Sequence, residues 1–211
     1  MTRRLYWESN ATESEVEVLH CERLATADGF KVRLNATPFH PQGGGQPADV
    51  GWIGNVEVFQ VEASDGEIIH YVRQVIALGV TTAKVDAARR QRHSRLHSAG
   101  HLIGHSLEPL AWRPVKAHHW PGESRVVFKP ADGAQAVDAA TVQSHCDDLI
   151  ASNLPCISRV DENQFRQVGF GHLPPYGCGG THVEATAELN GLHIVSVHVK
   201  KDQLIVQYDI Q

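Results

Sequence analysis

Two short segments that lie far apart in the sequence carry side chains with the spacing of metal ligands. His97 and His101 are four residues apart, so on a helix their imidazoles lie on one face, about one turn from each other. Cys178 and His182 repeat this gap in a Gly-rich segment. One thiolate and three imidazoles form a ligand set that suits Zn²⁺. The chain therefore has to fold so that a helix and a distant loop meet.

The length of 211 residues is enough for one large or two small domains. No apolar run is long enough to cross a bilayer, and the N-terminal residues lack the apolar core of a signal peptide. We therefore expect a cytoplasmic protein without a membrane partner. The four cysteines are too few and too irregularly spaced to predict a disulfide framework, and only Cys178 has a ligand-like context.

The formal net charge of −5 argues against a generally basic coat for nucleic acid, although one basic face can still bind phosphates. Basic residues gather directly before His97, with Asp86 as the only acid among them. They are Lys84, Arg89, Arg90, Arg92 and Arg95. This stretch is either the solvated start of a helix or a phosphate-binding surface.

The first part of the chain, to about residue 85, has the alternation and turn signals of short antiparallel strands. Strands are predicted at 16–19, 30–34, 56–61 and 68–72, with turns at 28–29 and 64–66. This half is predicted to be a small antiparallel β-barrel or sandwich. Between its strands lies a loop with three consecutive glycines, Gly43, Gly44 and Gly45, which permit close approach to the other domain or to a ligand.

A helix is predicted from about 86 to 109, with an apolar stripe that His97 and His101 border. The stripe consists of Leu96, Ala99, Ile103, Leu107 and Leu110. His93 and His105 extend the four-residue spacing, and we expect them to be partly exposed, since four such residues cannot all reach one ion. Gly100 and Gly104 lower helix propensity by roughly 1 kcal/mol each relative to Ala, which indicates that something packs closely against them.

The second half is predicted to be α+β, with helices on an antiparallel sheet. Strands are predicted at 125–129, 156–160, 164–168, 192–200 and 204–210, and a helix at 134–153. The segment 109–122 is interpreted as a connection rich in Pro and Trp. Within it, His118, His119 and Trp120 could line a pocket, although a histidine pair in a loop is more often structural or solvent-facing.

Taken together, the motifs resemble those of the AlaX family, the free-standing relatives of the editing domain of alanyl-tRNA synthetases. The family's His-Ser/Thr-Ala-x-His-Leu motif is matched by residues 97–102, and its Cys-Gly-Gly-Thr-His motif by residues 178–182. The segment 37–51 is similar to the family's Gly-rich motif, and 85–90 to its Val-Asp-x-x-Arg-Arg motif. The resemblance covers nearly the whole chain and leaves no room for a synthetase core.

The resemblance implies two domains, a Gly-rich β domain at 1–88 and an editing domain at 89–211 that is similar to the second additional domain of threonyl-tRNA synthetases. It implies hydrolysis, in trans, of alanine tRNA charged with serine or glycine. It also implies Zn²⁺ as the cofactor, with His97, His101, Cys178 and His182 as ligands. The implied partner is the acceptor end of tRNA, with Arg89, Arg90, Arg92 and Arg95 as candidate contacts, and the oligomeric state stays open between a monomer and a weak dimer.

The predicted site leaves its catalytic group open. Four protein ligands close a tetrahedral site, whereas a catalytic zinc keeps one position open. Either the ion becomes five-coordinate, or one residue is not a ligand, or the ion orients the substrate while another group delivers water. No Glu lies within the His pair, so the built-in base of metalloproteases is absent. A ribose hydroxyl of the tRNA or a histidine could serve, and Thr181 and Glu184 are further candidates.

Selectivity has a physical constraint, because alanine lies between glycine and serine in size. No steric sieve can admit both errors and exclude alanine, so a polar group has to bind the serine hydroxyl. The candidates are Ser98, Thr181 and the loop residues Gly43, Gly44, Gly45 and Gln46.

Two other functions remain compatible with the sequence. One is an RNA-binding module with a structural zinc site and no hydrolase activity. Structural sites usually pair nearby ligands, so the long separation of the two motifs favours an enzyme. The other is a hydrolase of small metabolite esters, for which the basic stretch before His97 would have no role.

Overall fold

The computed structural model describes residues 1–25, 28–163 and 165–211, and the chain divides into two compact units. The first unit comprises 1–43 and 47–91, and the second comprises 44–46 and 92–211. The short segment Gly44–Gln46 thus belongs to the second unit, although the sequence places it within the first. The predicted domains at 1–88 and 89–211 stay a prediction.

The first unit is built from short antiparallel strands. Their bounds are β2 Glu13–Arg23, β3 Phe30–Leu34, β5 Gly51–Ile53, β6 Val56–Ser64, β7 Glu67–Val72 and β8 Gly79–Val85. These six pair in the order β2-β3-β7-β6-β5-β8, and β8 pairs with β2 to close a barrel. The strands β1 Arg3–Arg4 and β4 Ala36–Thr37 form a small parallel pair, and a short 3₁₀ helix, η1, spans Leu5–Trp7.

The core of the first unit follows the alternation of its strands. Val32, Leu34, Val58, Val61 and Ile68 are among the side chains that have no exposed surface. The predicted turn at 64–66 is confirmed, with Asp65 and Gly66 both at positive φ between β6 and β7. β5 and β8 were not predicted, because β5 has three residues and β8 is rich in Thr and starts at a Gly.

Two α-helices are described, α1 Ala87–Leu107 and α2 Ala139–Ala151. All of α2 and most of α1 belong to the second unit, whereas the first turn of α1 belongs to the first unit. A four-stranded antiparallel sheet has the order β14-β15-β10-β9. Its strands are β9 Trp112–His118, β10 Arg125–Pro130, β14 Leu192–Lys200 and β15 Gln203–Ile210. A second sheet joins β11 Cys156–Val160, β12 Arg166–Phe170 and β13 Tyr176–Gly177. The 3₁₀ helices are η2 Glu108–Leu110 and η3 Thr186–Leu189.

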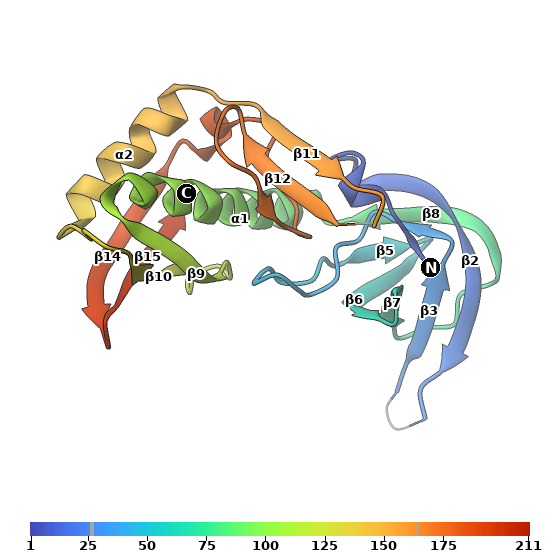
Figure 1. Cartoon of the computed structure of the whole chain (residues 1–211). Helices are drawn as coiled ribbons and strands as arrows, with labels where there is room; N and C mark the ends of the chain where they lie inside the picture. Colours follow the sequence, from blue (N-terminus) through green and yellow to red (C-terminus); the bar gives the residue numbers. More distant parts are fainter. Residues whose placement is uncertain (26–27, 164) are drawn as a thin grey trace. The chain divides into compact units, whose positions relative to one another are not determined.

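Figure 1 shows the ribbons of α1, α2 and the four-stranded sheet. Buried side chains from all of them form one hydrophobic core. Leu96, Ala99, Ile103 and Leu107 of the predicted stripe are fully buried in it, next to sheet residues such as Phe128. The predicted α+β class is confirmed. No helix among the described residues is long and apolar enough to cross a membrane.

Several predicted elements shift in the structure. The second helix is shorter than predicted and begins after Asp138, whose carboxylate accepts a hydrogen bond from the Thr141 N–H. The segment 109–122 contains the strand β9, which was missed because Pro114 and the flanking tryptophans conceal its alternation. The strand predicted at 164–168 is observed as Arg166–Phe170, and its first residue, Gln164, lies outside the described residues.

Candidate metal centre

The four predicted ligands lie together in the second unit. The possible ligand atoms of His97, His101, Cys178 and His182 are all within 4.8 Å of one another. Cys178 Sγ is 3.1 Å from His97 Nε2 and 3.2 Å from His182 Nε2. In a tetrahedral zinc site with ordinary bond lengths, ligand atoms are about 3.3–3.8 Å apart. The donor set therefore suits a zinc ion, and the separations in the structure lie on both sides of this range.

The four clustered residues are largely buried, which disfavours their charged forms when no cation is bound. His97, His101 and His182 are 2%, 8% and 4% exposed. Burial, followed by the positive charges of His119, His105 and Arg166, lowers the pKa of His101 to about 3. Burial also raises the pKa of the Cys178 thiol, against the N–H of Gly180 and the charge of Arg166. Nδ1 of His101 has no hydrogen-bond partner among the described residues. A bound cation would favour the thiolate and engage the neutral imidazoles.

The helix α1 presents its two histidines from one side, and glycines let other side chains approach it. A Cβ at Gly100 would lie 2.3 Å from Cε1 of His119, and one at Gly104 would lie 3.2 Å from the hydroxyl of Tyr176. Close packing at both glycines is therefore confirmed. His93 and His105 are 3% and 4% exposed, so the prediction that they are partly exposed is wrong.

The burial of His105 has a physical cause in its neighbour. Its ring stacks on that of Tyr176 at 4.4 Å with an angle of 5° between the planes. The Tyr176 hydroxyl donates to Glu108 Oε1 at 2.6 Å. A side chain from β13 thus covers this part of α1, which the apolar stripe alone does not predict.

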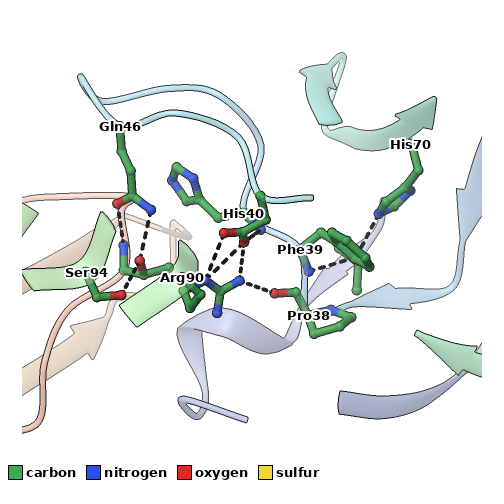
Figure 2. A network of polar contacts seen from close by, with 10 residues as sticks. Pro38, Phe39, His40, Gln46, His70, Arg90 and Ser94 are labelled. Atoms are coloured by element: carbon green, nitrogen blue, oxygen red, sulfur yellow. Dashed lines mark hydrogen bonds and ion pairs between the residues drawn. The ribbon is translucent and has the colours of Figure 1, made fainter. Parts of the chain in front are cut away.

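The Gly-rich loop reaches the metal ligands through Gln46. Nδ1 of His97 is 2.8 Å from Oε1 of Gln46, which also accepts the Thr181 N–H at 3.1 Å. Because an amide oxygen only accepts, Nδ1 of His97 carries the hydrogen and Nε2 keeps its lone pair for a metal. Nε2 of Gln46 donates to Thr181 Oγ1, which is also bonded to Ser94 Oγ at 2.7 Å (Figure 2).

Ser98 orients the fourth ligand in a similar way. Its Oγ is 3.1 Å from Nδ1 of His182 and accepts the Val183 N–H. Arg166 holds the backbone of the Cys178 loop, since its Nη1 donates to the carbonyl oxygens of Cys178 and Gly180 at 3.2 and 2.7 Å. Sequence reasoning missed Arg166, because no motif marks it and its partners lie on another segment.

A cavity of about 290 Å³ opens beside the four residues. Its lining includes His97, His101 and Cys178 from the cluster, Gly44 from the Gly-rich loop and Tyr176. His119, Lys116, Gly100 and Gly104 belong to the lining as well. This volume lies near the lower end of the range of small-molecule sites, about 300–1,000 Å³.

His119 lines the cavity with a defined tautomer. The Tyr208 hydroxyl donates to the Leu96 carbonyl at 3.0 Å, so it accepts from Nδ1 of His119 at 2.6 Å. The ring stacks on that of His97 with 4.3 Å between the centroids. Burial, followed by the charge of His118, lowers its pKa to about 4. His119 was predicted as a possible pocket residue, but none of its neighbours in the sequence distinguishes it from a solvent-facing histidine.

The other predicted site residues take varied positions. Ser98, Thr181 and Gln46 are buried beside the ligands and do not line the cavity, whereas Gly44 does. Gly43 has open space where a Cβ would lie. Glu184 is exposed and is not among the lining residues. The substrate-binding and catalytic roles of all these residues stay predictions.

The four predicted tRNA contacts also differ from one another. In the first unit Arg90 is 5% exposed and forms an ion pair with the buried Asp49, and it also donates to the Pro38 carbonyl (Figure 2). Arg95 donates to the backbone carbonyls of residues 188, 190 and 211. Arg89 and Arg92 are exposed. The guanidinium groups of Arg90 and Arg95 are therefore largely engaged within the chain, and tRNA contact by this stretch stays a prediction.

Comparison with known proteins agrees with the motifs. The chain is 26% identical over 228 residues to an alanine–tRNA ligase of Haloquadratum walsbyi, covering 95% of the chain and 25% of the ligase. It is 28% identical over 225 residues to the alanyl-tRNA editing protein Aarsd1-B of Xenopus laevis, covering 90% of the chain and 54% of that protein. The chain is a homologue of both. The resemblance to AlaX-type editing proteins is thus confirmed.

A third relative is the alanine–tRNA ligase of Korarchaeum cryptofilum, at 30% identity over 217 residues, which cover 86% of the chain and 24% of the ligase. The chain spans about a quarter of the length of these ligases and about half of the editing protein. No protein-family model matches the chain.

Proposed function

We propose that the protein is a hydrolase that deacylates alanine tRNA mischarged with serine, glycine or both. The observation that supports this most is the cavity, which is lined by three of the four clustered residues. A purely structural metal site needs no such opening, because its ligands close it off. The names of the relatives point to alanyl-tRNA editing and therefore to an aminoacyl ester as the substrate.

The proposed cofactor is Zn²⁺, held by His97, His101, Cys178 and His182. Such an ion supplies Lewis-acid polarisation of an ester carbonyl and acidification of a water molecule. Gln46 and Ser98 would position two of the ligand imidazoles through their Nδ1 atoms. The cavity would hold the aminoacyl group and limit the access of bulk water to it. The names of the relatives also make tRNA the proposed partner. The segment 89–211 is proposed to carry most of the site.

The neutral His119 imidazole lines the cavity, is not one of the four proposed ligands, and can accept a hydrogen bond. Its Nδ1 is held by Tyr208, which leaves Nε2 as the acceptor. Glu184, named earlier as a possible base, is exposed and does not line the cavity. The proposal therefore does not depend on Glu184.

The direct test is deacylation of alanine tRNA charged with serine, glycine or alanine. We expect loss of the seryl or glycyl ester and retention of the alanyl ester. A zinc-loaded protein that hydrolyses neither mischarged ester would refute the proposal and favour an RNA-binding module with a structural ion.

A second test separates the ion from the fold. The His101→Ala variant should lose zinc and deacylation together, because it removes one of the four clustered donors. Zinc content is measured by atomic absorption and activity by ester hydrolysis. Full activity in metal-free His101→Ala protein would show that the ion is incidental to the reaction.

A further inference from the structure

One face of the four-stranded sheet points away from the core of the second unit. On β15, Leu204, Val206 and Tyr208 are buried, while the intervening Ile205 and Gln207 are not. Since side chains alternate along a strand, these two lie on the opposite face. We call this the outer sheet face.

Register extends the outer sheet face across the neighbouring strands, because directly paired residues point to the same side. Arg125 of β10 pairs with Gln207 of β15 and with His118 of β9. Val127 pairs with Lys116, and Lys129 with Arg113. On β14, His198 pairs with Ile205, and Lys200 with Gln203. The basic members of the outer sheet face are Arg113, Lys116, His118, Arg125, Lys129, His193, His198 and Lys200.

On this face the described strands carry one acidic residue, Asp209 of β15, which pairs with His193 at the end of the sheet away from Lys129 and Lys200. The sequences of β9 and β10 contain no acidic residue, although the whole chain has a net charge of −5. In the described part of the chain, no ion pair joins Arg113, Lys116, Lys129 or Lys200 to a carboxylate. The adjacent Glu123 lies 3.4 Å from His118. The face is thus complementary to an anionic partner.

The outer sheet face is continuous with the cavity of the metal centre. β9 is an edge strand, and its residues 114–117 line the cavity together with His119. Trp120 follows directly and is 36% exposed. Its ring lies parallel to that of His118, at 5.6 Å and 10°. A ring surface next to a row of cations that leads into a cavity is an arrangement suited to single-stranded nucleic acid.

We propose that the outer sheet face binds the phosphates of the acceptor arm of tRNA, and that Trp120 stacks on an unpaired base near its 3′ end. The choice of tRNA rests on the proposed function, whereas the site itself rests on register, charge and the ring of Trp120. An acidic protein would also satisfy the charge, but the exposed ring of Trp120, next in sequence to the cavity-lining His119, favours RNA. The site differs from the predicted Arg stretch at 89–95.

The test measures binding of uncharged alanine tRNA to the whole chain at several salt concentrations. Lys129→Glu and Lys116→Glu should each raise the Kd roughly tenfold and lower the salt slope by about one, because each loses a phosphate contact. Arg159→Glu is the matched control, since Arg159 is an exposed cation on β11 of the other sheet. Arg92→Glu measures in the same way whether the basic stretch before His97 contributes to binding.

Stacking is tested separately with an acceptor-stem hairpin that has, or lacks, its unpaired 3′ end. Trp120→Ala should weaken binding of the hairpin with the 3′ end by roughly tenfold and affect the blunt hairpin little. Zinc content and circular dichroism identify any variant that fails to fold, and Trp120→Phe, which keeps a ring, should restore most of the binding.

The outcomes separate this proposal from the proposed function. Wild-type affinity in Lys116→Glu and Lys129→Glu would overturn the site, even if the protein deacylates mischarged tRNA. Equal losses in these variants and in Arg159→Glu would overturn it too, since they would indicate unspecific attraction. If the protein binds tRNA through this face but hydrolyses no ester, the proposed function fails and the site stands.

Discussion

The packing of Gly180 against His97 provides a test of the metal centre. A Cβ at Gly180 would lie 2.2 Å from Cε1 and 2.4 Å from Nδ1 of His97, and 2.9 Å from Oε1 of Gln46. A Cβ at the preceding Gly179 would meet nothing within 4 Å. Gly180→Ala and Gly179→Ala therefore make the same chemical change in the same loop, but only the first affects a ligand.

The size of the effect follows from these distances. Carbon atoms in contact are about 3.5–4.0 Å apart, so the His97 ring or the loop has to move by more than 1 Å. Overpacking of this kind costs about 1–3 kcal/mol, and loss of the hydrogen bond to Gln46 adds about 1 kcal/mol. We expect Gly180→Ala to lower the free energy of unfolding by about 2–4 kcal/mol. Zinc affinity should fall about 10–100-fold, as for other changes that disturb the support of a ligand.

The assay is a competitive titration of zinc against a chelator, together with urea denaturation of both variants. Gly179→Ala should resemble the wild type in both measurements. If Gly180→Ala binds zinc as tightly as Gly179→Ala and is equally stable, the close approach of Gly180 to His97 is wrong, and so is the reason given for a glycine there.

Three further predictions concern residues that are not among the cavity lining. Gln46→Leu should lower zinc affinity about 10–100-fold, whereas Gln46→Glu keeps the acceptor oxygen and should lose less; equal losses in the same chelator titration would contradict this. Burial lowers the pKa of His70 to about 4, against about 6.5 in the unfolded chain. The unfolded state therefore binds more protons, and His70 should contribute about 2 kcal/mol to the loss of stability from pH 7 to pH 5 in urea denaturation; His70→Gln should lessen the loss over this range by that amount. Arg90→Ala should destabilise the first unit by about 3–5 kcal/mol, because it leaves the buried Asp49 carboxylate unpaired, while the exposed Arg89→Ala should change thermal stability little; similar melting temperatures would contradict the structural role.

The parts of the fold that were predictable depend on local patterns. The strands predicted at 192–200 and 204–210 correspond to β14 and β15, which are joined by Lys201 and Asp202, both at positive φ. The helix bearing His97 and His101 was predictable within two residues at each end, because its apolar stripe repeats at helical spacing. β9 was not predictable, since only its first residue, Trp112, is buried and a bulge interrupts its pairing with β10.

Burial of polar residues was the least predictable property of the site. His105 was expected to be partly exposed, but Tyr176, which is 71 residues away in the sequence, stacks on it. His119 is separated from its partner Tyr208 by 89 residues. Such contacts depend on which segments meet in the fold, and neither residue's neighbours in the sequence carry that information.

The sequence by itself predicted which four side chains would cluster as possible metal ligands, because the chemistry of thiolate and imidazole and a four-residue spacing are local properties. It also determined the relation to alanyl-tRNA editing proteins. Only the tertiary structure decided what surrounds that set: Gln46 against His97, His119 in the wall of the cavity, and Arg166 behind the Cys178 loop. The physical reason is that a hydrogen bond or a cavity wall requires atoms within a few ångströms, and here the chain brings them together from segments that are far apart in the sequence.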